Sequence, residues 1–256
     1  MPAAQARTSG ALPPDELRAR VARLRWFHRL DLGHGIVTPG QDDSPRKLRW
    51  LHLPEDLNGR TVLDIGAWDG FFSFEAERRG AARVVAVDPA CWREPAWGPD
   101  GWGTQRGFNL ARIALGSAVE DLDTDLLDLR PERVGSFDLV LLLGVLYHLP
   151  DPWPVLERAA AVTAGTLVIE THGDFLDVRR PALAYYPSDG LDGDPSNWWG
   201  PNPPLLRARL RALGFERVEL VHRERLPYRA LRAGFRAFRR PRFRVSQGRF
   251  VLHAHR

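Results

Sequence analysis

The chain has 256 residues, of which 44% are hydrophobic and 27% are charged, and its formal net charge is +4. These proportions are typical of a soluble globular protein with one sizeable α/β domain and additions, and they exclude a low-complexity chain. No apolar run reaches the length of a transmembrane helix, and residues 1–20 lack the apolar core of a signal peptide. The single cysteine, Cys91, excludes an internal disulfide. We therefore expect a cytoplasmic protein with no membrane partner.

The positive charge is concentrated at the C-terminal end of the chain. Residues 205–256 hold 15 arginines against 3 glutamates, whereas residues 1–204 hold 21 basic against 29 acidic residues. A basic face on an acidic body could attract RNA or an anionic substrate, and a solvated arginine-rich surface is the simpler interpretation. Charge alone leaves both interpretations open.

The N-terminal residues predict a small helical cap. Residues 1–13 are expected to be disordered, and apolar side chains recur at helical spacing over 14–28. The glycine-rich residues 31–43 predict a loop, and a short helix is expected around 45–54. Residues 14–58 together form the predicted N-terminal helical cap, followed by one α/β domain over residues 59–256.

From residue 59 the chain alternates between predicted strands and helices. Apolar runs such as TVLDIG are typical of strands that are buried on both faces. The expected strands lie at 61–66, 83–88, within 121–129, at 137–148 and at 165–171. Helices are expected at 71–79, near 105–118 and from Asp151, with an irregular loop at 90–104. This alternation predicts an open parallel sheet with helices on both faces.

The C-terminal part departs from simple alternation. We expect a helix at 203–215, a strand at 217–224, a basic helix at 227–240 and a final strand at 248–256. The last two strands should form an edge pair that includes an antiparallel strand. The predicted fold class is therefore α/β, with a Rossmann-like, seven-stranded, mostly parallel sheet, helices on both faces and an antiparallel edge strand.

The turn after the first predicted strand reads Asp64-Ile65-Gly66-Ala67-Trp68-Asp69-Gly70. A dinucleotide-binding turn would place glycines and a helix N-terminus against a pyrophosphate. Here Ala67 replaces the middle glycine, and Asp69 offsets the positive field of the helix N-terminus. The turn therefore disfavours a phosphate and favours a ligand with a ribose, an ammonium and a sulfonium. Trp68 is expected either to wall this ligand or to pack against the N-terminal cap.

Acidic residues follow the first three predicted strands. Asp88 lies 24 residues after Asp64, where a carboxylate can accept both ribose hydroxyls, and Asp125 could receive an adenine amino group. Gly144 and Tyr147 lie at the carboxyl end of the fourth predicted strand. Because open α/β sheets bind ligands at the carboxyl ends of their strands, this set predicts S-adenosylmethionine as the cofactor.

Several stretches resemble known motifs. VLDIGAWDG, VVAVD and FDLVLLLGVLYHLPDP, within residues 60–170, resemble the motifs of class I SAM-dependent methyltransferases. RWFHRLDLGHGIVTPG, GVLYH and RFVLHAHR are similar to the tRNA wobble-uridine methyl- and carboxymethyltransferase family and its bacterial relatives. The broader resemblance covers most of the chain, and the narrower one rests on short stretches.

The resemblance implies roles for individual residues. Asp64, Gly66 and Gly70 would frame the methionine end of the cofactor, and Leu126 would pack on the adenine. The complete predicted cofactor set comprises Asp64, Gly66, Trp68, Gly70, Asp88, Pro89, Asp125, Leu126, Gly144 and Tyr147. In carboxymethyl-transferring members a tyrosine and an arginine near the C-terminus bind a carboxylate on the cofactor. Tyr147 and Arg249 fall at similar places in this sequence, and Arg46 or Lys47 are possible further counterparts. We expect ordinary S-adenosylmethionine, with carboxy-S-adenosylmethionine as the alternative.

The acceptor side is expected where the fourth and fifth strands end. His148 is the leading candidate for a general base, and it could instead cap the following turn. Glu170 and His172 should face the same site and are the other two predicted catalytic residues. With Asp174 they could suit a metal, but we expect none. The aromatic segment 184–204 predicts a lid or substrate platform. Predicted substrate contacts are His34, Tyr185, Tyr186, Asn197, Trp198, Trp199 and Arg249.

Two enzymatic functions compete. The aromatic lid favours a methyltransferase that acts on a hydroxyl of a saccharide or secondary metabolite. The narrower resemblance and the arginine-rich C-terminal residues favour a tRNA-modifying enzyme, in which RNA affinity would fall steeply with salt. An accessory protein with a degenerate site is a third hypothesis, which the intact set of acidic residues and glycines opposes. The oligomeric state is not predicted.

Overall fold

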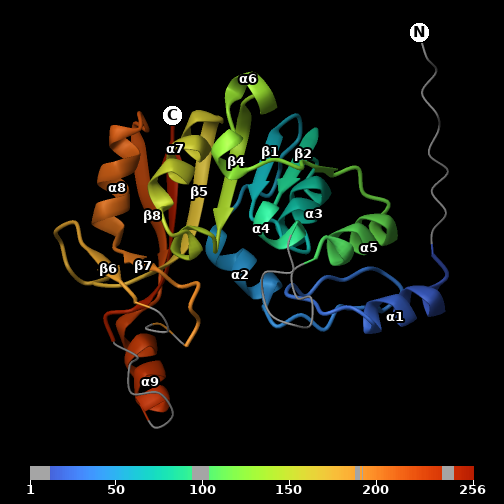
Figure 1. Cartoon of the computed structure of the whole chain (residues 1–256), viewed down its shortest axis with the longest axis horizontal. Helices are drawn as coiled ribbons and strands as arrows, with labels where there is room; N and C mark the ends of the chain where they lie inside the picture. The colour runs from blue at the N-terminus through green and yellow to red at the C-terminus, as the bar shows by residue number, and fades with distance from the viewer. Residues whose placement is uncertain (1–11, 94–103, 188–190, 192, 238–244) are drawn as a thin grey trace.

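The computed structural model describes residues 12–93, 104–187, 191, 193–237 and 245–256. In these residues a seven-stranded sheet has the order β3-β2-β1-β4-β5-β9-β8 (Figure 1). Its strands are β1 Thr61–Ile65, β2 Arg83–Val87, β3 Glu120–Asp121, β4 Phe137–Leu143, β5 Thr163–Gly173, β8 Arg217–Arg223 and β9 Gly248–His255. The first five are parallel, and β9 runs antiparallel to both β5 and the edge strand β8. The predicted fold class is confirmed.

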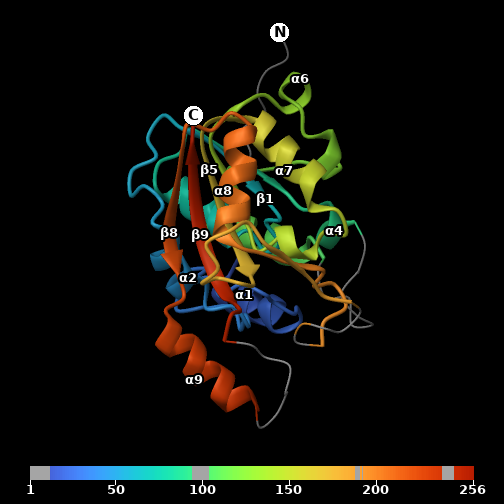
Figure 2. The ribbon, with the colours of Figure 1, turned by 90° about the vertical axis from the view of Figure 1, so that its left-hand side faces the viewer.

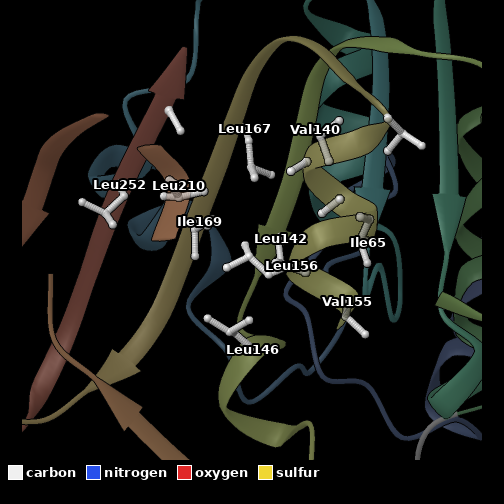
Figure 3. Close-up of a cluster of buried hydrophobic side chains, with 14 of the residues drawn as sticks. Ile65, Val140, Leu142, Leu146, Val155, Leu156, Leu167, Ile169, Leu210 and Leu252 are labelled. Atoms are coloured by element: carbon white, nitrogen blue, oxygen red, sulfur yellow. The ribbon is translucent and has the colours of Figure 1, made fainter. Parts of the chain in front are cut away.

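Strand alternation divides the interior into two cores. Leu63 and Ile65 of β1 lie in one hydrophobic cluster, whereas Val62 lies in the other. Successive side chains of a strand point to opposite faces, so a wholly apolar strand requires cover on both sides. Figure 3 shows the first cluster, which includes Ile65, Val140, Leu142, Leu146, Val155, Leu156, Leu167, Ile169, Leu210 and Leu252.

Helices supply this cover. Figure 2, which views the sheet from the β8 side, shows α7 (Pro152–Ala161) and α8 (Pro203–Ala212) on one face and α2 (Ser44–Leu51) on the other. The α2 face also carries α1 (Pro14–Ala22), α3 (Phe71–Arg78) and α5 (Arg106–Leu115), whose apolar residues belong to the second cluster. The shorter elements are α4 Pro89–Trp92, η1 Leu126–Asp128, α6 Pro131–Val134 and η2 Leu146–His148. Helix α9 (Leu226–Ala237) projects away from the sheet (Figure 2).

Some predicted boundaries were wrong. The first helix ends at Ala22, not near residue 28, because Trp26 turns inward, is 1% exposed and donates to the carbonyl of Val21. Strand β4 stops at Leu143, since Gly144 has a φ of 74° and a 3-10 turn follows. The segment 184–204 was expected to be a loop but shares a two-stranded sheet formed by β6 (Leu183–Tyr185) and β7 (Trp199–Pro201).

Three predictions fall wholly or partly outside the described residues. They are the disorder of residues 1–11, most of the irregular loop at 90–104, and the last part of the basic helix at 227–240. Among the described residues, no helix is both long and apolar enough to cross a membrane.

The core generates a stability prediction. Leu156 of α7 is 0% exposed and lies in the first cluster (Figure 3). We expect Leu156→Ala to lower the free energy of unfolding by about 2–5 kcal/mol, through lost transfer energy and the cavity it leaves. Urea denaturation measures this. The matched control is Ile113→Ala in α5, where the side chain is 51% exposed; a shift there as large as that of Leu156→Ala would contradict the assignment of this core.

Candidate active site

The turn between β1 and α3 brings the chain close to the end of β4. Gly66 has a φ of 81°, and a Cβ added there would lie 2.2 Å from Cγ2 of Val145. Gly70 has a φ of 85°, and an added Cβ would lie 2.6 Å from the ring of Phe108. Both positions therefore require glycine, for backbone conformation and for space.

Asp64 lies at the floor of this turn and is 1% exposed. Its Oδ2 accepts a 2.6 Å hydrogen bond from the hydroxyl of Ser73 on α3. Burial raises the pKa of Asp64 to about 7, and the carboxylate of Asp88 adds to this rise. A buried carboxylate with a raised pKa gains from a cation placed beside it.

Asp69 connects the same turn to the N-terminal cap. Its Oδ2 accepts the backbone N–H groups of Phe27 at 2.7 Å and His28 at 3.0 Å. The ring of Trp68 stacks on that of Phe27, with centroids 4.6 Å apart. Trp68 thus packs against the cap, one of its two predicted roles, while its contact with the cofactor stays a prediction. Burial also raises the pKa of Asp69 to about 7.

Asp88 follows β2 and is held in a fixed orientation. Its Oδ2 accepts from the amide of Trp68 at 2.9 Å, and its Oδ1 accepts from the amide of Cys91 at 3.0 Å, so it caps α4, whose first residue is Pro89. Because a carboxylate offers about four lone-pair sites, each oxygen retains capacity for a ribose hydroxyl. Burial raises the pKa of Asp88.

Asp125 lies beyond β3 and caps the 3-10 turn η1. Its Oδ1 accepts from the amide of Leu127 at 2.8 Å. Leu126, expected to pack on the adenine, is 8% exposed and belongs to the first core cluster, whereas Leu127 is 48% exposed. Contact of Asp125 and Leu126 with an adenine stays a prediction.

The residues around the turn fit S-adenosylmethionine. Asp64, Asp69 and Asp88 are each at most 5% exposed, and in the described part of the chain none of them is paired with an arginine or lysine. Such a set of carboxylates disfavours a phosphate and favours an ammonium and a sulfonium.

A second group of side chains gathers where β4, β5 and β9 meet. Arg249 of β9 forms a two-pronged ion pair with Glu170 of β5; its Nη2 lies 2.8 Å from Oε2, and its Nε donates to Oε1. The same guanidinium donates to the hydroxyl of Tyr147 at 3.3 and 3.4 Å and lies 5.1 Å from the centroid of its ring. A Cβ added at Gly144 would meet both partners of the ion pair, at 3.6 Å and 3.8 Å.

The ion pair changes the expected role of Glu170. Burial alone would raise its pKa, but the charge and hydrogen bonds of Arg249 outweigh burial, and Lys47 acts in the same direction, so the pKa is lowered. Lys47 itself pairs with Asp42 at 2.6 Å. Glu170 therefore stays anionic and holds Arg249, and the geometry does not favour it as a proton-accepting base.

His148 lies in η2, beside the segment predicted as a lid. Its Nδ1 is 2.9 Å from the hydroxyl and 3.3 Å from the carbonyl oxygen of Ser196. Its ring centroid is 4.0 Å from that of Tyr147. Burial lowers the pKa of His148 to about 4, against the opposing effect of Asp194. The imidazole is therefore neutral at neutral pH, as a proton acceptor must be.

Main-chain and indole hydrogen bonds fasten the lid segment to η2. The amide of Trp198 donates to the carbonyl of Tyr147 at 2.8 Å, and Nε1 of Trp199 donates to the carbonyl of Pro150 at 3.0 Å. Trp199 also contacts the ring of Tyr185, which is 55% exposed. Asn197 is buried and donates to the carbonyl of Leu191 at 3.2 Å.

His172 and Tyr186 belong to a buried polar network. Nε2 of His172 is 3.3 Å from the hydroxyl of Tyr186, which donates to Asp174 at 3.0 Å. Ser246 and Gln247, from the chain before β9, also donate to Asp174. Burial lowers the pKa of His172 to about 3, and the charge of Arg249 contributes. These bonds join β5, Tyr186 and the chain before β9, and they give Asp174 a structural role.

One predicted site residue lies away from the others, and two residues that contact the site were not predicted. His34 is exposed in the turn between Asp31 and Val37, and no interaction of the described residues joins it to η2. Ser73 and Ser196 contact predicted site residues, but their sequence context carried no signal for this. Within the described ranges, no group of three or more histidine, cysteine or acidic residues is arranged to hold a metal ion.

Comparison with known proteins identifies the class. Residues 42–222 match the methyltransferase domain family, and the chain belongs to this family. The predicted methyltransferase class is confirmed by this family membership.

Relatives by sequence carry a more specific name. The tRNA U34 carboxymethyltransferase of Desulfotalea psychrophila is 27% identical over 192 residues, which are 73% of this chain and 55% of that protein. The enzyme of the same name from Dichelobacter nodosus is 35% identical over 178 residues, covering 67% of this chain and 50% of that protein. The chain thus spans about half the length of these curated relatives.

Solved structures share the fold. The N-terminal domain of EvdMO1 with S-adenosylhomocysteine bound superposes with a TM-score of 0.65 at 19% identity, covering 97% of this chain and 99% of that one. An O-methyltransferase family protein from Burkholderia thailandensis gives a TM-score of 0.55 at 19% identity, covering 83% and 55%. These likenesses support the fold.

The geometry of Asp88 generates a binding prediction. We expect Asp88→Asn to weaken binding of S-adenosylhomocysteine about 10- to 100-fold, the cost of one or two hydrogen bonds to a charged group. Asparagine retains one acceptor for the buried amides, whereas alanine retains none. Isothermal calorimetry measures the affinity, and thermal unfolding checks that the chain stays folded. The control is Asp123→Asn, where the side chain is 84% exposed; equal losses in both variants would refute a ribose contact at Asp88.

Proposed function

We propose that this protein transfers a methyl group from S-adenosylmethionine to a hydroxyl of a saccharide or secondary metabolite. When bound, S-adenosylmethionine would supply a methyl group on a sulfonium, so that the acceptor oxygen could bond to the methyl carbon while the sulfur keeps the electron pair of the broken carbon–sulfur bond. The observation that carries the proposal is the neutral, partly buried His148 in η2, beside the strand ends that carry the cofactor residues. An oxygen acceptor needs a base that is unprotonated at the working pH and can receive its proton.

The other residues of the site position the acceptor and exclude water. Asp64 and Asp88 hold the cofactor at the ends of β1 and β2, and Tyr147 lies between His148 and the Arg249–Glu170 pair. Trp198, Trp199 and Tyr185 present aromatic faces of the kind that pack against sugars. Alignment of the reacting atoms and desolvation then provide much of the rate.

Ordinary S-adenosylmethionine is favoured over carboxy-S-adenosylmethionine. A guanidinium has five N–H groups. Arg249 directs them to two oxygens of Glu170 and to the hydroxyl of Tyr147, so little of its two-pronged binding capacity is left for a carboxylate on the cofactor. Its charge is also neutralised by Glu170. For Arg249 to bind a carboxylate on the cofactor, its ion pair with Glu170 would have to open.

A tRNA-modifying function is the second candidate, and the names of the relatives by sequence favour it. Against it, some of the C-terminal arginines make their contacts inside the fold. Arg229 is 0% exposed and binds both oxygens of Asp177, Arg232 pairs with Glu224, and Arg256 donates to carbonyl oxygens at the end of α7. An internal arginine is not available to a phosphate.

The proposal includes a division of the chain. Residues 14–58 would act as a helical cap and residues 59–256 as the catalytic domain, with 184–204 as the lid. The two hydrogen bonds from the cap to Asp69 support a cap that closes over the cofactor turn. A cytoplasmic location agrees with the single buried cysteine, Cys91.

An assay with labelled methyl groups tests the proposal. We expect the purified chain to transfer methyl from S-adenosylmethionine to a hydroxyl in a panel of deoxysugars and glycosides. D-fucose comes first in the panel because EvdMO1 was crystallised in its presence. Parallel reactions offer carboxy-S-adenosylmethionine and unmodified tRNA at low salt. Carboxymethyl transfer to tRNA, or tRNA affinity that falls steeply with salt, would replace this proposal with the second candidate.

The pH dependence of kcat/KM tests the base. With a pKa of about 4, His148 is neutral from about pH 5 upward and loses base function only as pH falls through 4, so kcat/KM should be level between about pH 5 and 8. A fall of kcat/KM below about pH 6.5 in wild type that is absent from His148→Gln would contradict the lowered pKa of His148. His148→Gln should lower kcat about 100-fold or more while S-adenosylhomocysteine binding persists.

A further inference from the structure

The lid segment places a hydroxyl and a carboxylate behind His148. Ser196 Oγ lies 2.9 Å from Nδ1 of His148 and donates to Oδ1 of Asp194 at 2.6 Å. The amide of Ser196 donates to the same carboxylate oxygen at 2.9 Å. Asp194, Ser196 and His148 therefore form a continuous hydrogen-bonded chain that ends on the imidazole.

The chemistry of these groups fixes which nitrogen of His148 carries hydrogen. A serine hydroxyl has one hydrogen, and here it is given to a carboxylate, which can only accept. Oγ must then accept from Nδ1. The carbonyl oxygen of Ser196, 3.3 Å from Nδ1, can also only accept. Two separate acceptors thus require a hydrogen on Nδ1, and the basic lone pair of the neutral ring lies on Nε2.

We propose that Asp194 and Ser196 are positioning residues for the methyl-transfer reaction, which hold His148 in the Nδ1–H tautomer and so direct Nε2 to receive the acceptor proton. The inference rests on the proposed function, in which His148 is the base. In the wrong tautomer the ring would offer a hydrogen where a lone pair is needed. Once Nε2 takes the proton, the carboxylate of Asp194, acting through the hydroxyl, stabilises the imidazolium.

The same contacts make the base depend on the lid. Ser196 and Asp194 belong to the segment 184–204, whose neighbouring Trp198 is bonded to the main chain of Tyr147. The lid segment therefore supplies part of the catalytic machinery, beyond any contact it makes with an acceptor.

Nitrogen-15 NMR of the histidine rings tests the tautomer without a known acceptor. The chain has eight histidines, and the signals absent from His148→Gln identify His148. We expect the Nδ1–H tautomer in wild type. In the double variant Asp194→Ala/Ser196→Ala the main-chain carbonyl oxygen of residue 196 is still an acceptor beside Nδ1, and we expect a mixture of the two tautomers. Ser196→Thr retains a hydroxyl and should keep the wild-type tautomer. Trp199→Phe removes a different contact of the lid segment, the hydrogen bond to the carbonyl of Pro150, and His148 should keep the wild-type tautomer in this variant too.

Kinetics supply the second readout. Ser196→Ala and Asp194→Asn should each lower kcat about 10- to 100-fold, less than loss of the base itself, with S-adenosylhomocysteine affinity unchanged. An Nε2–H tautomer in wild type, a tautomer unchanged in the double variant, or full kcat in that variant while His148→Gln is impaired would overturn the inference. If His148→Gln keeps full kcat, the proposed base fails, and the NMR result still decides whether the lid sets the tautomer.

Discussion

The ion pair between Arg249 and Glu170 organises the acceptor side of the site. It joins β9 to β5, and through the Tyr147 hydroxyl it reaches η2. Glu170 is 1% exposed, so desolvation of its charge is costly, and removing either partner would leave a buried charge uncompensated. The pair exists because β9 returns antiparallel between β5 and β8, which sets Arg249 opposite His172 in the register, beside Glu170. The sheet topology thus places the guanidinium of Arg249 where it contacts both β5 and η2.

The cofactor side follows the opposite electrostatic principle. Asp64 and Asp69 are buried without a cationic partner among the described residues, and each has a pKa raised to about 7. A carboxyl whose folded pKa is raised stabilises the fold fully below its unfolded pKa and loses that contribution as pH rises through about 7. Without a ligand, ionisation of these two carboxyl groups therefore lowers the stability of the folded chain. A bound sulfonium and ammonium would offset this cost, so stability is exchanged for affinity toward a cation.

The sequence predicted most of the fold and the glycine conformations of the turn after β1, because buried parallel strands and glycine-spaced turns are locally encoded. It could not predict how single polar groups are satisfied. Asp69 looked like a repellent for anions, but its carboxylate holds two amides of the cap, a contact across 41 and 42 residues. Glu170 was a candidate catalytic residue in the sequence, but Arg249, 79 residues later, neutralises its charge. Strand bounds failed where a left-handed glycine, Gly144, ends β4.

The contact between Ser196 and His148 could not be predicted from the sequence either. Nothing in PSNWW marks a serine as the partner of a histidine 48 residues earlier, since the contact arises only when β7 and η2 pack together. Lid segments are commonly treated as walls that exclude water and shape specificity. In the proposed site the lid segment would also set the tautomer of His148, because the hydroxyl of Ser196, which donates to Asp194, and the carbonyl oxygen of Ser196 both lie beside Nδ1. If the segment is a lid and His148 is the base, as proposed, one packing event would both exclude water and arrange the base for the acceptor.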